Sequence, residues 1–310
     1  MHAIEILDLS KDYAVGFWKK KPRTALKPLT LTVEAGETFG FLGPNGAGKT
    51  TTLKLLMGIL FPTSGSARIL GRDFHDPEIK KRIGFLPEQP YFYDYLSAPE
   101  LLNYYAQLSG MPEAERKLRI PQVLERVGLS DAGNRQLRKF SKGMLQRIGI
   151  AQAIIHDPEV LFLDEPMSGL DPLGRHEVRE LIQNLKDAGK TIFFSTHILS
   201  DAEALCDRVA VIHKGELRGV GVMNELRSTG GDKSEIIWQG AGALTAVTAN
   251  LLESHVTGDL VRATASSNSL DLILSTLRQE HARLVSVTPL HGTLEEYFLS
   301  RTVDDERVHA

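Results

Sequence analysis

The chain has 310 residues, of which 24% are charged and 42% hydrophobic, and its formal net charge is −3. This composition is typical of a globular protein with one large or two ordinary domains, and the charge gives no general electrostatic case for binding nucleic acid or anionic membranes. Cys206 is the only cysteine, which excludes an intramolecular disulfide and a cysteine-based zinc site. The longest uncharged stretch, residues 236–252, is too short and too polar to span a bilayer, so we expect another chain to supply any membrane part.

The first elements along the chain are strands that lead into a glycine-rich loop. Residues 2–9 alternate in hydrophobicity and residues 29–33 resemble a returning strand, which together predict an antiparallel pair. An apolar run at 38–42 then predicts a buried strand. It ends at the sequence GPNGAGKTT, residues 43–51, and helical periodicity follows at 51–59.

The loop fits the phosphate-loop template in the structural context that the template requires. Gly43 and Gly48 are separated by four residues, and Lys49 and Thr50 follow. Backbone N–H groups of such a loop surround phosphate oxygens, and the positive end of the helix dipole faces them. We expect Lys49 to reach the β- and γ-phosphates of a nucleotide and the Thr50 hydroxyl to bind Mg²⁺.

A block of helices interrupts the strands in the middle of the chain. Residues 83–86 predict a strand, residues 98–128 are helical in pattern, and another helix is expected to begin near Gly143. Helices inserted between the strands of an α/β core predict a helical subdomain, at about residues 88–158.

Two apolar runs after this block end in polar side chains. Residues 160–163 precede Asp164 and Glu165, and residues 191–194 precede the sequence Ser195-Thr196-His197. Such runs are typical of parallel strands buried on both faces, and their carboxyl ends form the edge at which open sheets bind ligands. We expect Asp164 to hold Mg²⁺, directly or through water, and Glu165 to orient and deprotonate a water molecule.

The character of the sequence changes after about residue 225, which predicts domains at 1–225 and 226–310. Residues 228–232 are linker-like in composition. The elements expected beyond them are strand 234–238, helix 243–253, strand 259–264, helix 269–280, strand 283–288 and helix 294–301. This pattern predicts a small α+β domain, whose role we leave open between regulation and dimerisation.

Several motifs resemble those of the ATP-binding subunits of ATP-binding cassette (ABC) transporters. The sequence VLFLDEPMSGLDP at 160–172 is similar to the Walker B segment and D-loop, and STHILSD at 195–201 to the switch-histidine loop. FSKGMLQR at 140–147 occupies the place of the family signature. These motifs occur in the family's order over residues 1–225. The resemblance implies an α/β fold: a P-loop NTPase core with a mixed or parallel sheet, an N-terminal antiparallel β subdomain and a helical subdomain.

The resemblance also implies a symmetric homodimer in which two copies enclose ATP head to tail. Ser141 and Gly143 of one copy would meet the γ-phosphate bound to the other, Asp171 would contact the opposite copy, and Tyr13 would stack on adenine. His197 would bond the γ-phosphate and keep Glu165 and water in place. The residues expected at ATP are Tyr13, Gly43, Pro44, Asn45, Gly46, Ala47, Gly48, Lys49, Thr50, Thr51, Glu88, Gln89, Ser141, Gly143 and Asp171.

Two departures from the family pattern leave roles open. Lys142 and Met144 replace a glycine and a glutamine of the signature. The glutamine position of the Q-loop falls on Glu88 or on Gln89, and we favour Glu88 because its distance to residues 96–97 fits better. At this position a carboxylate would add a ligand for Mg²⁺.

The function expected from the resemblance is ATP hydrolysis that drives a separate integral membrane permease, in the manner of an exporter. Residues 292–302, GTLEEYFLSRT, resemble the C-terminal segment often present in this exporter subgroup. The protein would then be cytoplasmic and bound to the inner face of the cell membrane through the permease, and nucleic acid is not an expected partner. The alternative is a soluble ABC ATPase that acts on ribosomes or DNA. The transported substrate is not encoded in any motif of this chain.

Overall fold

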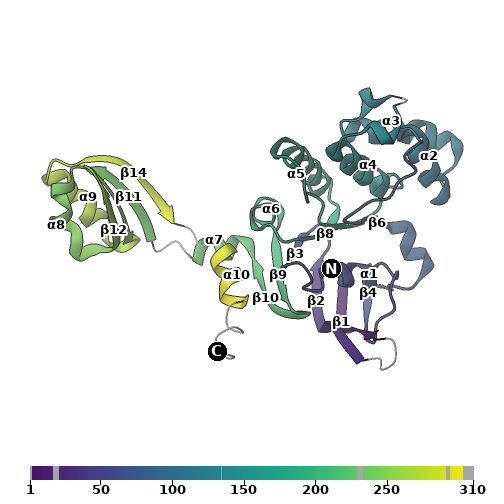
Figure 1. The fold of residues 1–310 in the computed structure, drawn as a ribbon, viewed down its shortest axis with the longest axis horizontal. Helices are drawn as coiled ribbons and strands as arrows, with labels where there is room; N and C mark the ends of the chain where they lie inside the picture. Colours follow the sequence, from purple (N-terminus) through teal and green to yellow (C-terminus); the bar gives the residue numbers. More distant parts are fainter. Residues whose placement is uncertain (1, 17–20, 134, 230–232, 291–293, 303–310) are drawn as a thin grey trace. The chain divides into compact units, whose positions relative to one another are not determined.

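The computed structural model describes residues 2–16, 21–133, 135–229, 233–290 and 294–302. The chain divides into two compact units, Met1–Val220 and Gly221–Ala310 (Figure 1). This division lies close to the limit that the composition predicts at residue 225. That each unit is an independent domain stays a prediction.

The first unit begins with an antiparallel sheet. Its order is β2 (Lys21–Glu34), β1 (His2–Val15), β4 (Ser64–Ile69) and β5 (Arg72–Asp73). Alternation decides which face is covered, since Ile4, Ile6 and Leu9 of β1 are fully buried whereas Leu7 is exposed. The antiparallel β subdomain expected at the N-terminus is therefore present.

A second, largely parallel sheet forms the centre of this unit. Its order is β10 (Glu216–Val222), β9 (Arg208–His213), β3 (Thr38–Leu42), β8 (Thr191–Thr196), β7 (Val160–Asp164) and β6 (Ile83–Leu86). The five strands from β9 to β6 pair in parallel. Every residue of β3, β7 and β8 is buried, which explains why these sequences are continuously apolar. Phe193 packs its ring against those of Phe39 and Phe162, at centroid distances of 5.6 and 5.9 Å.

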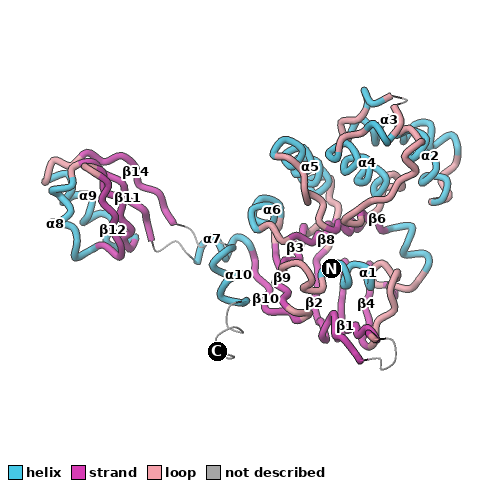
Figure 2. The backbone as a smooth tube through the Cα atoms, in the orientation of Figure 1, coloured by secondary structure: helices cyan, strands magenta, loops and turns pink. Residues whose placement is uncertain are grey.

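Helices surround this sheet and also form a group of their own. The helices of this unit are α1 (Lys49–Leu56), α2 (Ala98–Leu108), α3 (Glu113–Arg126), α4 (Lys142–Ile154), α5 (Pro172–Asp187) and α6 (Leu199–Leu205), with a 3₁₀ helix at Pro77–Arg82. Figure 2 shows α2, α3 and α4 lying together at one end of the unit, as expected of the helical subdomain. None of the helices in the described ranges combines the length and the hydropathy that crossing a bilayer requires.

The second unit is a four-stranded antiparallel sheet with helices on one face. Its order is β12 (Leu251–Thr257), β13 (Leu260–Ser266), β11 (Lys233–Gln239) and β14 (Arg283–Leu290), and α8 (Leu244–Val247) and α9 (Leu270–Gln279) cover one face. The unit also contains α7 (Met223–Thr229) and α10 (Leu294–Thr302), which contact each other. The succession from β11 to β14 is the βαββαβ arrangement of ferredoxin-like folds. Trp238 and Val261 of the sheet are buried against Val247 of α8 and Ile273 of α9.

The prediction of a helix over residues 243–253 was wrong. The α-helix ends at Val247, a 3₁₀ turn covers Thr248–Asn250, and the following residues form strand β12. Pairing with β13 overrides the local helical pattern, because a short apolar stretch does not by periodicity alone distinguish a strand from a helix.

Candidate functional site

The glycine-rich loop joins β3 to α1 in a conformation that its glycines permit. Gly46 and Gly48 have φ angles of 79° and 111°, in the left-handed region that side chains disfavour. A Cβ on Gly43 would collide with the backbone carbonyl of Ile212. Lys49 begins α1 and is only 5% exposed, and its Nζ donates to the carbonyl oxygens of Gly43 and Pro44 at 2.6 and 3.2 Å. The loop therefore encloses the ammonium group that we expect to meet phosphate.

The end of β7 lies opposite this loop and presents Asp164. The carboxylate oxygen Oδ1 of Asp164 accepts a hydrogen bond from Ser195 Oγ at 2.6 Å and from Thr50 Oγ1 at 3.2 Å. Ser195 comes from the neighbouring strand β8, directly opposite Asp164 in the ladder. This hydrogen-bonding role of Ser195 was not predicted, although its position at the strand end was noted.

The oxygens of Thr50 and Asp164 suit a magnesium ion. No group of three or more His, Cys, Asp or Glu side chains is placed to hold a metal within the described ranges. Mg²⁺ typically takes one or two protein oxygens and completes its shell with water and substrate phosphates, so a hydroxyl and a carboxylate that converge beside a phosphate loop fit it. The donor set therefore matches this ion better than one that needs an all-protein cage.

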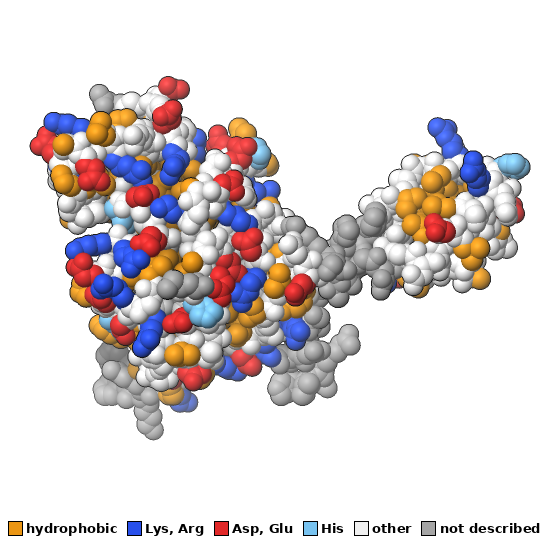
Figure 3. Space-filling view, turned by 180° about the vertical axis from the view of Figure 1, so that it is seen from behind, with side chains coloured by type: hydrophobic (Ala, Val, Ile, Leu, Met, Phe, Trp, Pro, Cys, Tyr) orange, Lys and Arg blue, Asp and Glu red, His pale blue; other side chains and the backbone are white. Residues whose placement is uncertain are grey.

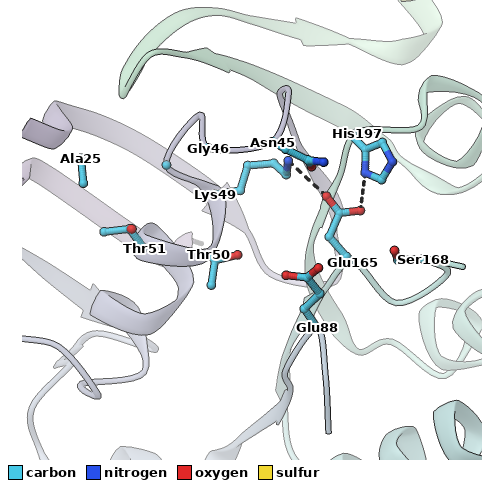
Figure 4. A pocket seen from close by; sticks show the side chains of 11 residues that line it. Ala25, Asn45, Gly46, Lys49, Thr50, Thr51, Glu88, Glu165, Ser168 and His197 are labelled. Atoms are coloured by element: carbon cyan, nitrogen blue, oxygen red, sulfur yellow. Dashed lines mark hydrogen bonds and ion pairs between the residues drawn. The ribbon is translucent and has the colours of Figure 1, made fainter.

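Glu165 sits between two nitrogen-bearing side chains. Its Oε1 lies 3.1 Å from Lys49 Nζ, and its Oε2 lies 2.9 Å from His197 Nδ1. Figure 4 shows Lys49 and His197 approaching the two oxygens of the same carboxylate. The Glu165 side chain is 6% exposed, whereas that of His197 is 38% exposed. A buried carboxylate is thus balanced by an ammonium group on one oxygen and by an imidazole on the other.

The backbone directs Glu165 away from Asp164. Glu165 has a φ of 49°, which few residues other than glycine adopt. Its N–H lies 3.1 Å from Ser195 Oγ and 3.2 Å from the Ser195 carbonyl oxygen, and both can accept it. Because the chain turns here, the two adjacent acids face different groups. This is what their separate predicted roles require, Asp164 at the metal and Glu165 at a water molecule.

These groups share one pocket, of about 340 Å³. It is lined by Ala25, Asn45, Gly46, Gly48, Lys49, Thr50, Thr51, Glu88, Glu165, Ser168 and His197. Glu88 is among the lining residues and Gln89 is not, which favours Glu88 as the Q-loop residue. Ala25 was not predicted, since nothing in its own sequence neighbourhood marks it. It reaches the pocket because β2 passes close to the loop. A Cβ on Gly48 would lie 2.7 Å from the Ala25 carbonyl oxygen.

Tyr13 is not among the residues that line this pocket. It lies on β1 opposite Arg23 of β2, two residues before Ala25, and 36% of it is exposed. Lys11 Nζ lies 5.4 Å from the centre of the Tyr13 ring. Stacking of this ring on adenine stays a prediction.

Three of the predicted residues, Ser141, Gly143 and Asp171, line a second pocket of about 400 Å³, which shares no lining residue with the first. Ser141 caps α4 by accepting from Met144 N at 3.2 Å, and Asp171 caps α5 by accepting from Gly174 N at 2.9 Å. Lys142 lies against Gly169, where a Cβ would collide with its ammonium group. One copy of the chain therefore keeps the two expected sets of ATP-contacting residues apart.

Comparison with known proteins gives consistent similarities. A family model described as ABC transporter matches residues 26–168. An uncharacterised ABC transporter ATP-binding protein of Synechocystis is 45% identical, over 96% of this chain and 84% of that protein. A daunorubicin resistance ATP-binding protein of Streptomyces coeruleorubidus is 35% identical, over 92% of this chain and 93% of that protein. A solved dimer of the ATP-binding cassette MJ0796, in a post-hydrolysis state bound to ADP and phosphate, has a TM-score of 0.65 and 26% identity, over 71% of this chain and 98% of that one.

We expect Lys49→Ala to weaken ATP binding by about 10- to 100-fold, because a charge-assisted hydrogen bond contributes about 1.5–3 kcal/mol. The measurement is a titration with a fluorescent ATP analogue. Lys54→Ala is the matched control, since Lys54 is an exposed lysine of the same helix. Equal affinities of the wild type and Lys49→Ala would contradict the phosphate-loop assignment.

Proposed function

Because the chain belongs to the ABC transporter family of ATP-binding proteins and is an ATPase of that family, we propose that it drives a separate integral membrane permease, as the energising subunit of an exporter. The observation that carries the proposal is the placement of Glu165 between Lys49 and His197, beside the loop that suits phosphate. The relative named for daunorubicin resistance supports export as the direction.

Phosphate binding begins at Lys49. Its ammonium group contacts Glu165 and two loop carbonyls, so the phosphates of ATP would replace the carboxylate as its anionic partner. Thr50 and Asp164 would hold Mg²⁺, which neutralises charge on the phosphates when it is bound. The positive end of α1 adds to the attraction, since the helix begins at Lys49 itself.

Glu165 would then act as the general base. Once phosphate takes over Lys49, Oε1 of Glu165 is free to accept a proton from a water molecule that attacks the γ-phosphate. His197 holds the other oxygen at 2.9 Å, which fixes the direction of the carboxylate. In the family mechanism His197 also bonds the γ-phosphate, and its exposure of 38% leaves it accessible for that contact.

A second copy of the chain would complete each site. Ser141 and Gly143 lie at the N-terminus of α4, where backbone N–H groups and the helix dipole favour an anion. Together with Asp171 they lie outside the pocket that contains Lys49, so a γ-phosphate held by one copy could meet them only on another. The dimeric cassette MJ0796 supports this arrangement by analogy. Lys142, packed on Gly169, would make the signature and the D-loop move as one body.

The helical subdomain offers a surface for the permease. A pocket of about 740 Å³ is lined mainly by aromatic and apolar side chains between residues 90 and 145. Tyr91 is 97% exposed, and Tyr93 and Tyr95 are 51% and 59% exposed. Exposed aromatic groups that line a pocket beside the Q-loop suit an apolar helix of the membrane subunit.

We expect Glu165→Gln to bind ATP and to accumulate as a dimer while hydrolysis falls at least 100-fold, because the amide keeps its shape but accepts no proton. Phosphate release and light scattering after size exclusion measure the two effects. Glu125→Gln, at an exposed position of α3, is the control. Hydrolysis by Glu165→Gln at the wild-type rate would show that another group is the base.

Glu88 and Gln89 make different predictions for magnesium. Glu88→Ala should raise the Mg²⁺ concentration that gives half-maximal ATPase activity, since it removes an oxygen ligand or a partner of metal-bound water from the pocket. Gln89→Ala is the matched control and should change this concentration little. The opposite result would place the Q-loop function on Gln89.

Recovery of the tagged chain from detergent-solubilised membranes tests the partner. An integral membrane protein should accompany it, and Tyr91→Ser should reduce the yield of that protein. Leu118→Ser is the control, because Leu118 is 70% exposed on α3 and outside the aromatic pocket. Recovery of ribosomes without a membrane protein would favour action on ribosomes instead.

A further inference from the structure

Strand β12 forms one edge of the sheet in the second unit. It pairs with β13 on one side only, and its other side has no strand partner among the residues that the structure describes. A strand with one unpaired edge presents a row of free backbone donors and acceptors, which natural proteins usually protect with lysine, proline or a covering segment. The sequence LLESHVT contains neither lysine nor proline.

Nothing in the described residues covers this edge. Every residue from 252 to 257 is exposed, and the apolar Leu252 and Val256 are 55% and 50% exposed. Figure 3 shows exposed hydrophobic side chains gathered on the face of this unit that it presents. Neither Glu253 nor His255 has a side-chain hydrogen bond or ion pair within the described part of the chain. The strand thus leaves both its backbone edge and its two ionisable side chains without partners there.

The sequence of β12 is complementary to itself when read in the opposite direction. If two copies pair antiparallel with Ser254 opposite Ser254, Glu253 of each copy lies opposite His255 of the other, and Leu252 lies opposite Val256. A carboxylate opposite an imidazole that donates a hydrogen bond is favourable, and so is an apolar pair. The pairing of β12 with β13 is irregular at Leu252, between Leu251 and Glu253, whereas Glu253–Thr257 pair without a further shift. The proposed register therefore rests on Glu253, Ser254 and His255.

Other registers are worse. A shift by one residue would join the helix-covered face of one sheet to the open face of the other, because the side-chain period of a strand is two. A shift by two residues would place Glu253 opposite Glu253, where like charges are destabilising, or His255 opposite His255, which loses the carboxylate–imidazole pair. The register centred on Ser254 also keeps the helix-covered faces of both sheets on the same side. Ser254 pairs with buried Ala263 on the helix-covered face, whereas His255 pairs with Arg262 on the open face.

We propose that β12 pairs with β12 of a second copy about a two-fold axis at Ser254, which joins the four strands of each copy into one continuous antiparallel sheet. The contact is isologous, as expected of a two-fold dimer. It involves no residue of either ATP-related pocket, so it forms without nucleotide. Its area is small, and it acts by raising the effective concentration of one ATPase unit near the other.

Disulfide trapping in the full chain tests the pairing. Directly opposed residues of antiparallel strands have Cα atoms about 4.5–5.5 Å apart, which a disulfide can bridge. We expect Ser254→Cys to form a covalent dimer under mild oxidation, with or without ATP. Cys206 gives little background, since it is buried and burial raises the pKa of its thiol. Thr288→Cys, exposed on the opposite edge strand β14, should form at least tenfold less dimer.

A charge exchange tests the register. Glu253→Lys and His255→Glu should each weaken dimerisation of the nucleotide-free chain in sedimentation experiments. The double variant should restore it, because it again places a nitrogen donor opposite a carboxylate. Adding Lys49→Ala to the wild type, to both single variants and to the double variant weakens ATP binding in each. Any dimer that is then measured does not depend on the ATP-dependent dimerisation of the proposed function. Equal trapping at residues 254 and 288, or a double variant as weak as the single ones, would overturn the proposal.

Discussion

The parallel ladder between β7 and β8 is the constraint on which the site depends. It places Asp164 opposite Ser195, and pairing of β3 with β8 places the start of the phosphate loop beside Thr196. The buried apolar residues of these strands hold that register. A carboxylate pair, a hydroxyl, an imidazole and an ammonium group therefore meet at one edge, although they come from distant parts of the sequence.

The charges at this edge are arranged for exchange of one anion for another. Glu165 and Lys49 are each almost completely buried, and a buried charge without its partner costs several kcal/mol, about 3–5 in typical cases. The ammonium group is therefore compensated by the carboxylate until phosphate arrives. The same exchange would free the Glu165 carboxylate next to the γ-phosphate. There it is proposed to accept a proton from the water molecule that attacks this phosphate. Binding of ATP and activation of Glu165 as the base thus depend on the same ion pair, between Glu165 and Lys49.

Local patterns predicted the central sheet, the loop and the acids that follow β7, because a buried parallel strand and a phosphate loop leave strong signals over a few residues. They failed where the outcome depends on distant residues. The first three residues of β12 were predicted as the end of a helix and the rest of the strand was not predicted, since its pairing with β13 is not visible in its own sequence. Spacing alone left Glu88 and Gln89 open, and Ala25 lines the pocket only because β2 passes close to it. The role of Tyr13 remains a prediction, as its ring lies outside the residues that line the pocket.

The left-handed backbone at Glu165 implies a conflict between thermal stability and turnover. A residue other than glycine in this region costs about 1–3 kcal/mol, and the surrounding structure must impose it. Glycine would relieve that strain, yet it would remove the carboxylate that faces Lys49 and His197. Selection of this protein for heat resistance alone would therefore favour inactive variants at residue 165, and any thermostable form that retains turnover must gain its stability elsewhere.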